Sequence, residues 1–235
     1  LDPGRIRYLI GATNVGDVCR SDDQGQTWTV VGQPESGLPN ARPTQVFLDL
    51  ASPVQQRRLL VTLFDHGLYE TRDGGKSWQC INGDLPAEAA RKPRGLFLDP
   101  TDSKRLVLAL GGTPDKGAGV WTSTDGARSW TRLDTQSLFA DITSLTVDPR
   151  QRDVMYVTTR QTYDHAARRP YAGGLFVSRD GGRMWESLLA FRFVTSVAVS
   201  PTDSRTLYVS TTDHPYHDAY PAEGVLKSVD GGRTW

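Results

Sequence analysis

The sequence predicts an all-β fold, a β-propeller with four-stranded antiparallel blades of about 50 residues that forms a partial ring of a larger propeller. Two observations predict it: an eight-residue motif recurs five times, and apolar segments of strand length recur in step with it. The motif reads Ser/Thr-x-Asp-x-Gly-x-Thr/Ser-Trp, with Ala127 and Met184 as its departures in the third and fourth copies. Its copies occupy residues 21–28, 71–78, 123–130, 178–185 and 228–235.

Four short strands are expected in each repeat. The first and second strands are apolar runs, the third precedes the motif, and the fourth follows its Trp. The expected first strands are 44–50, 94–100, 143–149 and 195–201, each ending in Asp-Pro or a relative of it. The expected second strands are 59–64, 106–110, 154–159 and 206–210.

These strands predict one propeller domain over residues 1–235. The expected blades are 1–43, which is incomplete, then 44–93, 94–142 and 143–194, and finally 195–235, also incomplete. Leu1-Asp2-Pro3 aligns with the end of a first strand, so the first blade lacks its innermost strand. The last blade lacks its fourth strand. The two ends therefore do not complete one blade, which favours an arc of a longer propeller, with six or more blades.

The motif has a structural explanation. Asp and Ser side chains accept hydrogen bonds from backbone N–H groups in a tight turn, Gly allows a positive φ, and Trp covers the hairpin. The motif resembles the Asp-box, or BNR, repeat of sialidases, xyloglucan-type glycoside hydrolases, sortilin-like receptors and photosystem assembly factors. The resemblance implies that the box lies away from the ligand-binding face. We therefore expect a structural role for the box aspartates Asp23, Asp73, Asp125, Asp180 and Asp230.

Composition excludes several classes of function. Lys plus Arg equals Asp plus Glu, at 27 each, so nothing indicates a nucleic-acid partner. No run approaches the apolar length of a membrane helix, so no membrane insertion is expected. The first residues are not a signal peptide, yet the resemblance implies an extracellular or periplasmic location. No cofactor is expected, and the His and Asp spacing matches no zinc signature, so no metal is expected.

The loops between second and third strands are the predicted binding face. The distance from the Asp-Pro position to the box grows along the chain, from 3 to 21, 50 to 71, 100 to 123, 149 to 178 and 201 to 228. We expect all of this growth to lie in those loops, which hold all four histidines. Tyr, His, Asp and Arg suit sugars, because aromatic rings stack on pyranoses and Arg binds carboxylates. The candidate binding residues are Asp65, His66, Tyr163, Arg168, Arg169, Tyr171, His214, Tyr216 and Tyr220.

Catalysis is the less defined part of this prediction. The best-placed candidate acid–base residues are Asp164, Asp213, Asp218, His165 and His217. The resemblance implies a propeller that binds a polysaccharide or glycan and, if it is an enzyme, acts as a glycoside hydrolase, with a polysaccharide lyase as the lesser variant. No local motif transfers a catalytic Asp of that family onto this chain. A non-catalytic propeller that binds proteins or assists assembly is the alternative, because fold does not choose between these functions.

Overall fold

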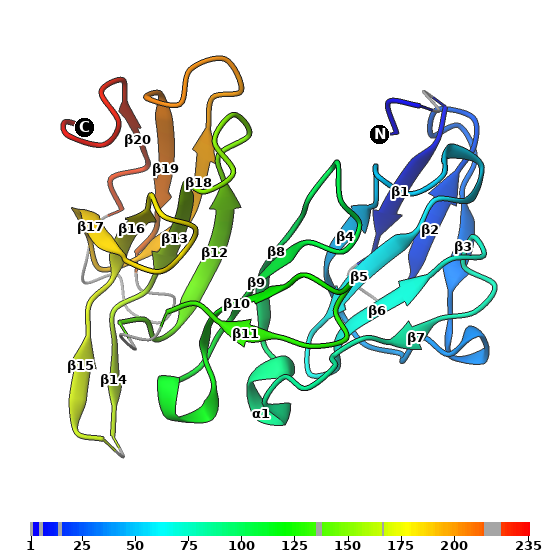
Figure 1. Cartoon of the computed structure of the whole chain (residues 1–235), viewed down its shortest axis with the longest axis horizontal. Coiled ribbons are helices and arrows are strands. Elements are labelled where there is room, and N and C mark those ends of the chain that lie inside the picture. The colour runs from blue at the N-terminus through cyan, green and yellow to red at the C-terminus, as the bar shows by residue number, and fades with distance from the viewer. Residues whose placement is uncertain (1, 5–6, 14–15, 135–137, 166, 214–221) are drawn as a thin grey trace. The chain divides into compact units, whose positions relative to one another are not determined.

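The computed structural model describes residues 2–4, 7–13, 16–134, 138–165, 167–213 and 222–235. The chain divides into two compact units. Unit 1 comprises Leu1–Val107 and Thr122–Thr131, and unit 2 comprises Leu108–Trp121 and Arg132–Trp235. Nearly all regular structure is β-strand, in antiparallel sheets whose neighbours follow chain order (Figure 1). The predicted all-β propeller fold is therefore confirmed.

Most of the described strands form sheets of three or four strands. The first contains β1 (Leu9–Ala12), β2 (Val18–Ser21) and β3 (Thr29–Gly32), and the second contains β4 (Pro43–Leu48), β5 (Leu59–Leu63), β6 (Gly67–Thr71) and β7 (Gln79–Cys80). The third contains β8 (Pro93–Leu98), β9 (Leu106–Leu110), β10 (Gly119–Ser123) and β11 (Thr131–Arg132). The fourth contains β12 (Ile142–Val147), β13 (Met155–Thr159), β16 (Gly174–Ser178) and β17 (Glu186–Ala190), and the fifth contains β18 (Val194–Val199), β19 (Leu207–Thr211) and β20 (Val225–Ser228).

A further two-stranded sheet interrupts the fourth blade. It pairs β14 (Thr162–Asp164) with β15 (Arg169–Tyr171) and extends away from the strands of that blade as a separate finger (Figure 1). Four single helical turns lie in connections: η1 (Pro34–Ser36), η2 (Val54–Gln56), α1 (Ala87–Ala90) and η3 (Pro114–Lys116).

The core of each unit lies where neighbouring blades face one another. Val18 of β2 and Leu38, which follows η1, pack against Leu59, Val61 and Leu63 of β5, whose alternate side chains face the first blade. In unit 2 the equivalent cluster joins the fourth and fifth blades and is formed by Tyr156, Leu175, Val177, Val194, Val197, Leu207 and Val209. β5, β9 and β13 are buried at every position, as expected for middle strands covered on both faces.

One expectation about loop lengths is wrong for the second blade. The turn from β5 to β6 contains only residues 64–66. The longer connection is instead the one between β4 and β5, which contains η2. The extra residues form a 3₁₀ turn after Pro53, so they lie on the Asp-box side of the blade.

Candidate functional site

The Asp boxes form closed hydrogen-bond circuits within their own turns. In the first box, Asp23 Oδ1 accepts from the Ser21 hydroxyl at 2.7 Å and from the Thr27 N–H at 2.9 Å, and Oδ2 accepts from the Thr27 hydroxyl at 2.6 Å. These donors, led by the Thr27 hydroxyl, lower the pKa of Asp23 to about 2. Each box carboxylate is held by donors of its own turn, which supports the structural role expected of the boxes.

The fourth box is the one whose circuit lacks a member. Met184 stands where the other boxes have Thr or Ser, and its side chain is 59% exposed. Asp180 therefore keeps the Ser178 hydroxyl and the Met184 N–H but has no hydroxyl donor at that position. Its pKa is still lowered, chiefly by the Met184 N–H.

The predicted residues of the second blade lie in the tight turn between β5 and β6, in unit 1. Asp65 has a positive φ of 63°, and its backbone N–H donates to the Arg91 carbonyl at 2.8 Å. Arg91 also lies 3.7 Å from the Asp65 carboxylate. The His66 carbonyl accepts from the Asn82 side chain, and the His66 side chain is exposed. The turn is thus ordered and presents two exposed polar side chains.

The enlarged loop of the fourth blade, in unit 2, forms the β14–β15 finger. In the register of these two strands, Tyr163 lies opposite Pro170, and Asp164 lies opposite Arg169. The Tyr163 ring is 48% exposed and meets the His165 ring edge-on, with 5.0 Å between ring centroids. An exposed aromatic ring therefore lies against the His165 ring on this finger.

The remaining side chains of the finger anchor it. Tyr171 is buried, and the Arg169 guanidinium lies 4.9 Å from the centroid of its ring. Asp164 is also buried, and its carboxylate accepts from the Ala167 N–H at 3.0 Å. Arg168 is exposed at the turn with a φ of 50°. This arrangement favours a structural role for Asp164 in the turn.

An ion pair at the base of the finger was not identified from the sequence. Arg160 contacts both carboxylate oxygens of Asp141, with Nε 3.0 Å from Oδ2 and Nη2 3.1 Å from Oδ1. The Arg160 N–H donates to the Asp141 carbonyl, and the Gln161 N–H donates to the Arg192 carbonyl. Both side chains of the pair are about one-third exposed. In the sequence, an acidic residue precedes the first strand of this blade and a basic residue follows its second strand. That pattern could have indicated the ion pair.

The fifth blade contributes less to the described site. Asp213 follows β19, and its carboxylate accepts from the Thr212 hydroxyl at 3.2 Å. The Glu223 N–H donates to the Thr211 hydroxyl, which closes the described part of the loop. The other predicted residues of this loop lie outside the described residues: His214, Tyr216, His217, Asp218 and Tyr220.

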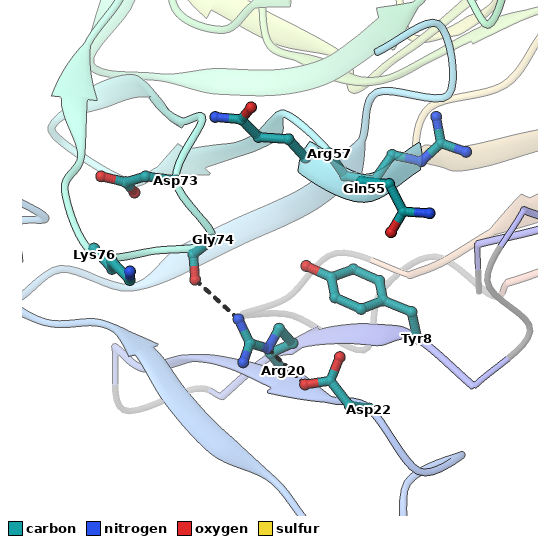
Figure 2. Close-up of a pocket in the computed structure, with 9 residues that line it drawn as sticks. Tyr8, Arg20, Asp22, Gln55, Arg57, Asp73, Gly74 and Lys76 are labelled. Carbon is teal, nitrogen blue, oxygen red and sulfur yellow. Dashed lines mark hydrogen bonds and ion pairs between the residues drawn. The ribbon is translucent and has the colours of Figure 1, made fainter. Parts of the chain in front are cut away.

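A pocket of about 410 Å³ lies in unit 1, on the Asp-box side between the first and second blades. Figure 2 shows Tyr8, Arg20 and Asp22 of the first blade along one side, Gln55 and Arg57 opposite them, and the second box adjoining. Two further grooves adjoin the boxes at Asp73 and Asp180. None of the predicted binding residues within the described ranges lines these three hollows.

Among the residues that the structure describes, no group of three or more His, Cys, Asp or Glu side chains is arranged to hold a metal ion. Within the same part of the chain, none of the helices has the length and apolar character needed to cross a bilayer.

Fold and motif together define an Asp-box β-propeller. The family model Sortilin-Vps10, described as sortilin, neurotensin receptor 3, matches residues 16–168 and again residues 66–234. The chain therefore belongs to the Sortilin-Vps10 family. A comparison with curated proteins gave no match.

Solved structures show the same fold at low sequence identity. A GH74 enzyme of Niastella koreensis is 20% identical, with a TM-score of 0.73, and the match covers 100% of this chain and 37% of the enzyme. The GH74 xyloglucanase of Xanthomonas campestris is 19% identical, with a TM-score of 0.63, over 99% of this chain and 38% of that enzyme. YCF48, solved with a D1 peptide, is 16% identical, with a TM-score of 0.57, over 95% of this chain and 61% of YCF48. The chain thus spans well under half the length of the two enzymes.

Proposed function

We propose that this chain is the glycan-binding part of an Asp-box propeller and that it binds a polysaccharide through the loop side of unit 2. The exposed Tyr163 ring, fixed edge-on to His165 on the β14–β15 finger, is the observation that carries this proposal. A sugar ring presents an apolar C–H face, and a pre-positioned aromatic ring offers a matching surface at little entropic cost. The fold likeness to GH74 enzymes supports the same class of ligand.

The neighbouring polar groups suit the rim of such a site. Arg168 and His165 are exposed beside Tyr163 and can donate to sugar hydroxyls. The Asp141–Arg160 pair supplies both acceptors and donors at the base of the finger. The proposal includes an extracellular or periplasmic location, which fits a polysaccharide ligand.

The proposal is restricted to binding, because hydrolysis requires a pair of catalytic carboxyl groups as well. A glycosidase needs two carboxyl groups about 5–10 Å apart across the bond that breaks. Asp164 is buried and bonded within the finger's turn, and Asp218 lies outside the described residues. Asp213 remains a candidate acid or base, and the turnover assay below tests it.

The test is binding of the intact chain to xyloglucan, β-glucan and uronic-acid oligosaccharides by calorimetry. Tyr163→Ala should weaken binding to the preferred oligosaccharide at least tenfold, which is about 1.4 kcal/mol. Tyr208→Ala is the matched control, because Tyr208 is also an exposed tyrosine of unit 2, at 41%, but lies on β19. Equal affinity of Tyr163→Ala and the wild-type chain, or no binding to any of these sugars, would overturn the proposal. Product release in the same mixtures measures cleavage.

A second candidate function is recognition of an extended peptide. Membership of a family described as a neurotensin receptor and the likeness to YCF48 with its peptide favour it. The finger also has a suitable edge: Pro170 removes an N–H donor from β15, so β14 is the strand better able to add a partner strand. Binding of an unstructured peptide that survives Tyr163→Ala would support this function over glycan binding.

A further inference from the structure

The pocket between the first and second blades departs from the repeat in the turn that forms its wall. Its wall contains η2, which lengthens the connection from β4 to β5, and Gln55 and Gln56 of that turn line the cavity. The corresponding turns in the third and fourth blades, at residues 99–105 and 148–154, contain no helical turn. In a repeat protein, residues added to one repeat map to a surface loop and are often part of a binding face.

The groove between the second and third boxes shows what fills such a space elsewhere. Arg58 is 1% exposed there and donates to the Ser103 carbonyl at 2.9 Å and to the Gly126 carbonyl at 3.3 Å. Tyr8 is its counterpart in the first blade, because the Tyr8 carbonyl accepts from the Asp2 N–H as the Arg58 carbonyl accepts from the Asp49 N–H. Tyr8 has no guanidinium to cross the groove, so the space remains open.

Arg20 makes part of the missing contact from a different strand. Its Nη1 donates to the Gly74 carbonyl at 3.3 Å, at the box position equivalent to Gly126. Figure 2 shows this contact along the edge of the cavity, with Gln55 facing Arg20 and Tyr8 across it. Arg20, bonded to Gly74, therefore bounds one side of the pocket, and Gln55 of η2 bounds the other.

The charges lining the pocket are balanced. Arg20 Nε lies 2.9 Å from Asp22, and Arg57 forms a two-point contact with Asp2 at 2.8 and 3.0 Å. The Asp73 carboxylate accepts from the Ser77 and Thr71 hydroxyls, and the opposite charge of Lys76 on the lining balances it. An anion would find most of these cations already neutralised. An apolar ligand would leave the polar lining without partners.

We propose that this pocket binds a neutral saccharide of one or two pyranose units. Sugar hydroxyls both donate and accept, which matches a lining of two carboxamides, two guanidinium groups, an ammonium, two carboxylates and the phenol of Tyr8. The volume of about 410 Å³ lies within the usual range for small-molecule sites. This second saccharide site uses none of the loop residues of unit 2 and stands independently of the function proposed above.

The experiment measures binding of neutral gluco- and xylo-oligosaccharides to the intact chain, with chemical-shift changes recorded at the Gly74 amide. Gln55→Ala should weaken binding at the pocket, and Gln55→Trp, which fills the cavity, should abolish it. Gln151→Ala and Gln151→Trp are the controls, because Gln151 is an exposed glutamine in the corresponding turn of the fourth blade. Thermal unfolding of the Gln55 variants verifies that they fold.

The outcomes separate the two sites. Binding that is lost in Gln55→Trp and retained in Tyr163→Ala supports the pocket even if the loop side of unit 2 binds nothing. Binding lost only in Tyr163→Ala, with the Gly74 amide unmoved, overturns the pocket and leaves the proposed function standing. Inorganic phosphate or galacturonate displacing the neutral sugar would also overturn it, since the lining would then prefer anions.

Discussion

The indole N–H of Trp78 donates to the carbonyl oxygen of Val31 at 2.8 Å, so the second box is bonded to the outer strand of the first blade. Trp78 is 6% exposed, whereas Trp28 of the first box is 48% exposed and bonds to the Gly25 carbonyl of its own turn. The same motif residue therefore has two different environments.

Replacing Trp78 should cost far more stability than replacing Trp28. Trp78→Ala removes a buried aromatic side chain and an interblade hydrogen bond, and we expect a loss of about 3–5 kcal/mol. Trp28→Ala exposes little new surface, and its loss should be below about 1.5 kcal/mol. Urea unfolding of both variants gives the comparison. Equal losses would show that the interblade packing of Trp78 does not contribute as described.

Arg58 should be the most sensitive charged residue of unit 1. It is buried against Glu70, with Asp49 at 3.7 Å, so its removal takes the nearby cation from the buried Asp49 and leaves Glu70 with Arg72 alone. We expect Arg58→Ala to destabilise the chain by about 3–5 kcal/mol. Arg205→Ala is the control, since its pair with Asp203 is exposed and should contribute at most about 1 kcal/mol. Similar unfolding midpoints for the two variants would contradict this prediction.

Asp134 and Asn82 each accept a hydrogen bond from a backbone N–H at the same point of their blades, but only Asp134 can carry a charge. Asp134 Oδ1 accepts from the Val120 N–H at 2.9 Å, and Asn82 Oδ1 accepts from the Leu68 N–H at 2.8 Å at the corresponding point of the second blade. Burial raises the pKa of Asp134 above its ordinary value of 3.8, despite the nearby Arg132. Its ionised form therefore opposes folding, and stability falls as pH rises above that value.

Asp134→Asn should remove this pH-dependent cost. The variant should be at least as stable as the wild-type chain at pH 7, and its advantage should shrink as the pH is lowered to 4. Asn82→Asp should show the reverse, losing stability as pH rises from 4 to 7. Thermal unfolding across this range provides the measurement, and a disadvantage of Asp134→Asn that grows with pH would rule the account out.

The incomplete fourth box offers a gain of stability. Met184→Thr should supply Asp180 with the hydroxyl that Asp23 receives from Thr27, and the melting temperature should rise. Because these contacts lower the pKa of the Asp, the added stability should be present above pH 4 and lost as the pH falls towards 2. Met184→Val is the control with a similar shape and no hydroxyl. A rise of the same size in Met184→Val would exclude the hydrogen bond as its cause.

Local chemistry explains why the blades could be predicted. The Asp23 circuit closes within residues 21–27, so the box folds the same way wherever its residues occur. The strands beside it are apolar and regularly spaced, and β9 has the predicted bounds Leu106–Leu110. Neither feature depends on distant parts of the chain.

The features that were missed depend on context. β14 and β15 have three residues each, and Pro170 argues against a strand when read alone; pairing across the turn and burial of Tyr171 decide it. The η2 turn was overlooked because the span from Asp-Pro to box does not reveal which connection is longer. The Asp141–Arg160 pair joins the residue before β12 to the residue after β13, and the pairing of these two strands brings them together.

Gly75 lies so close to Val31 that an added Cβ would collide with the outer strand of the first blade, and Gly182 lies against the Leu133 side chain, which follows β11 of the third blade. Each of these boxes can therefore complete its packing only after the strand before it is in place. Within each unit, blades should accordingly assemble in succession, with every finished blade acting as a template for its neighbour. Cooperativity would then be transmitted from blade to blade along the chain and not through one common nucleus.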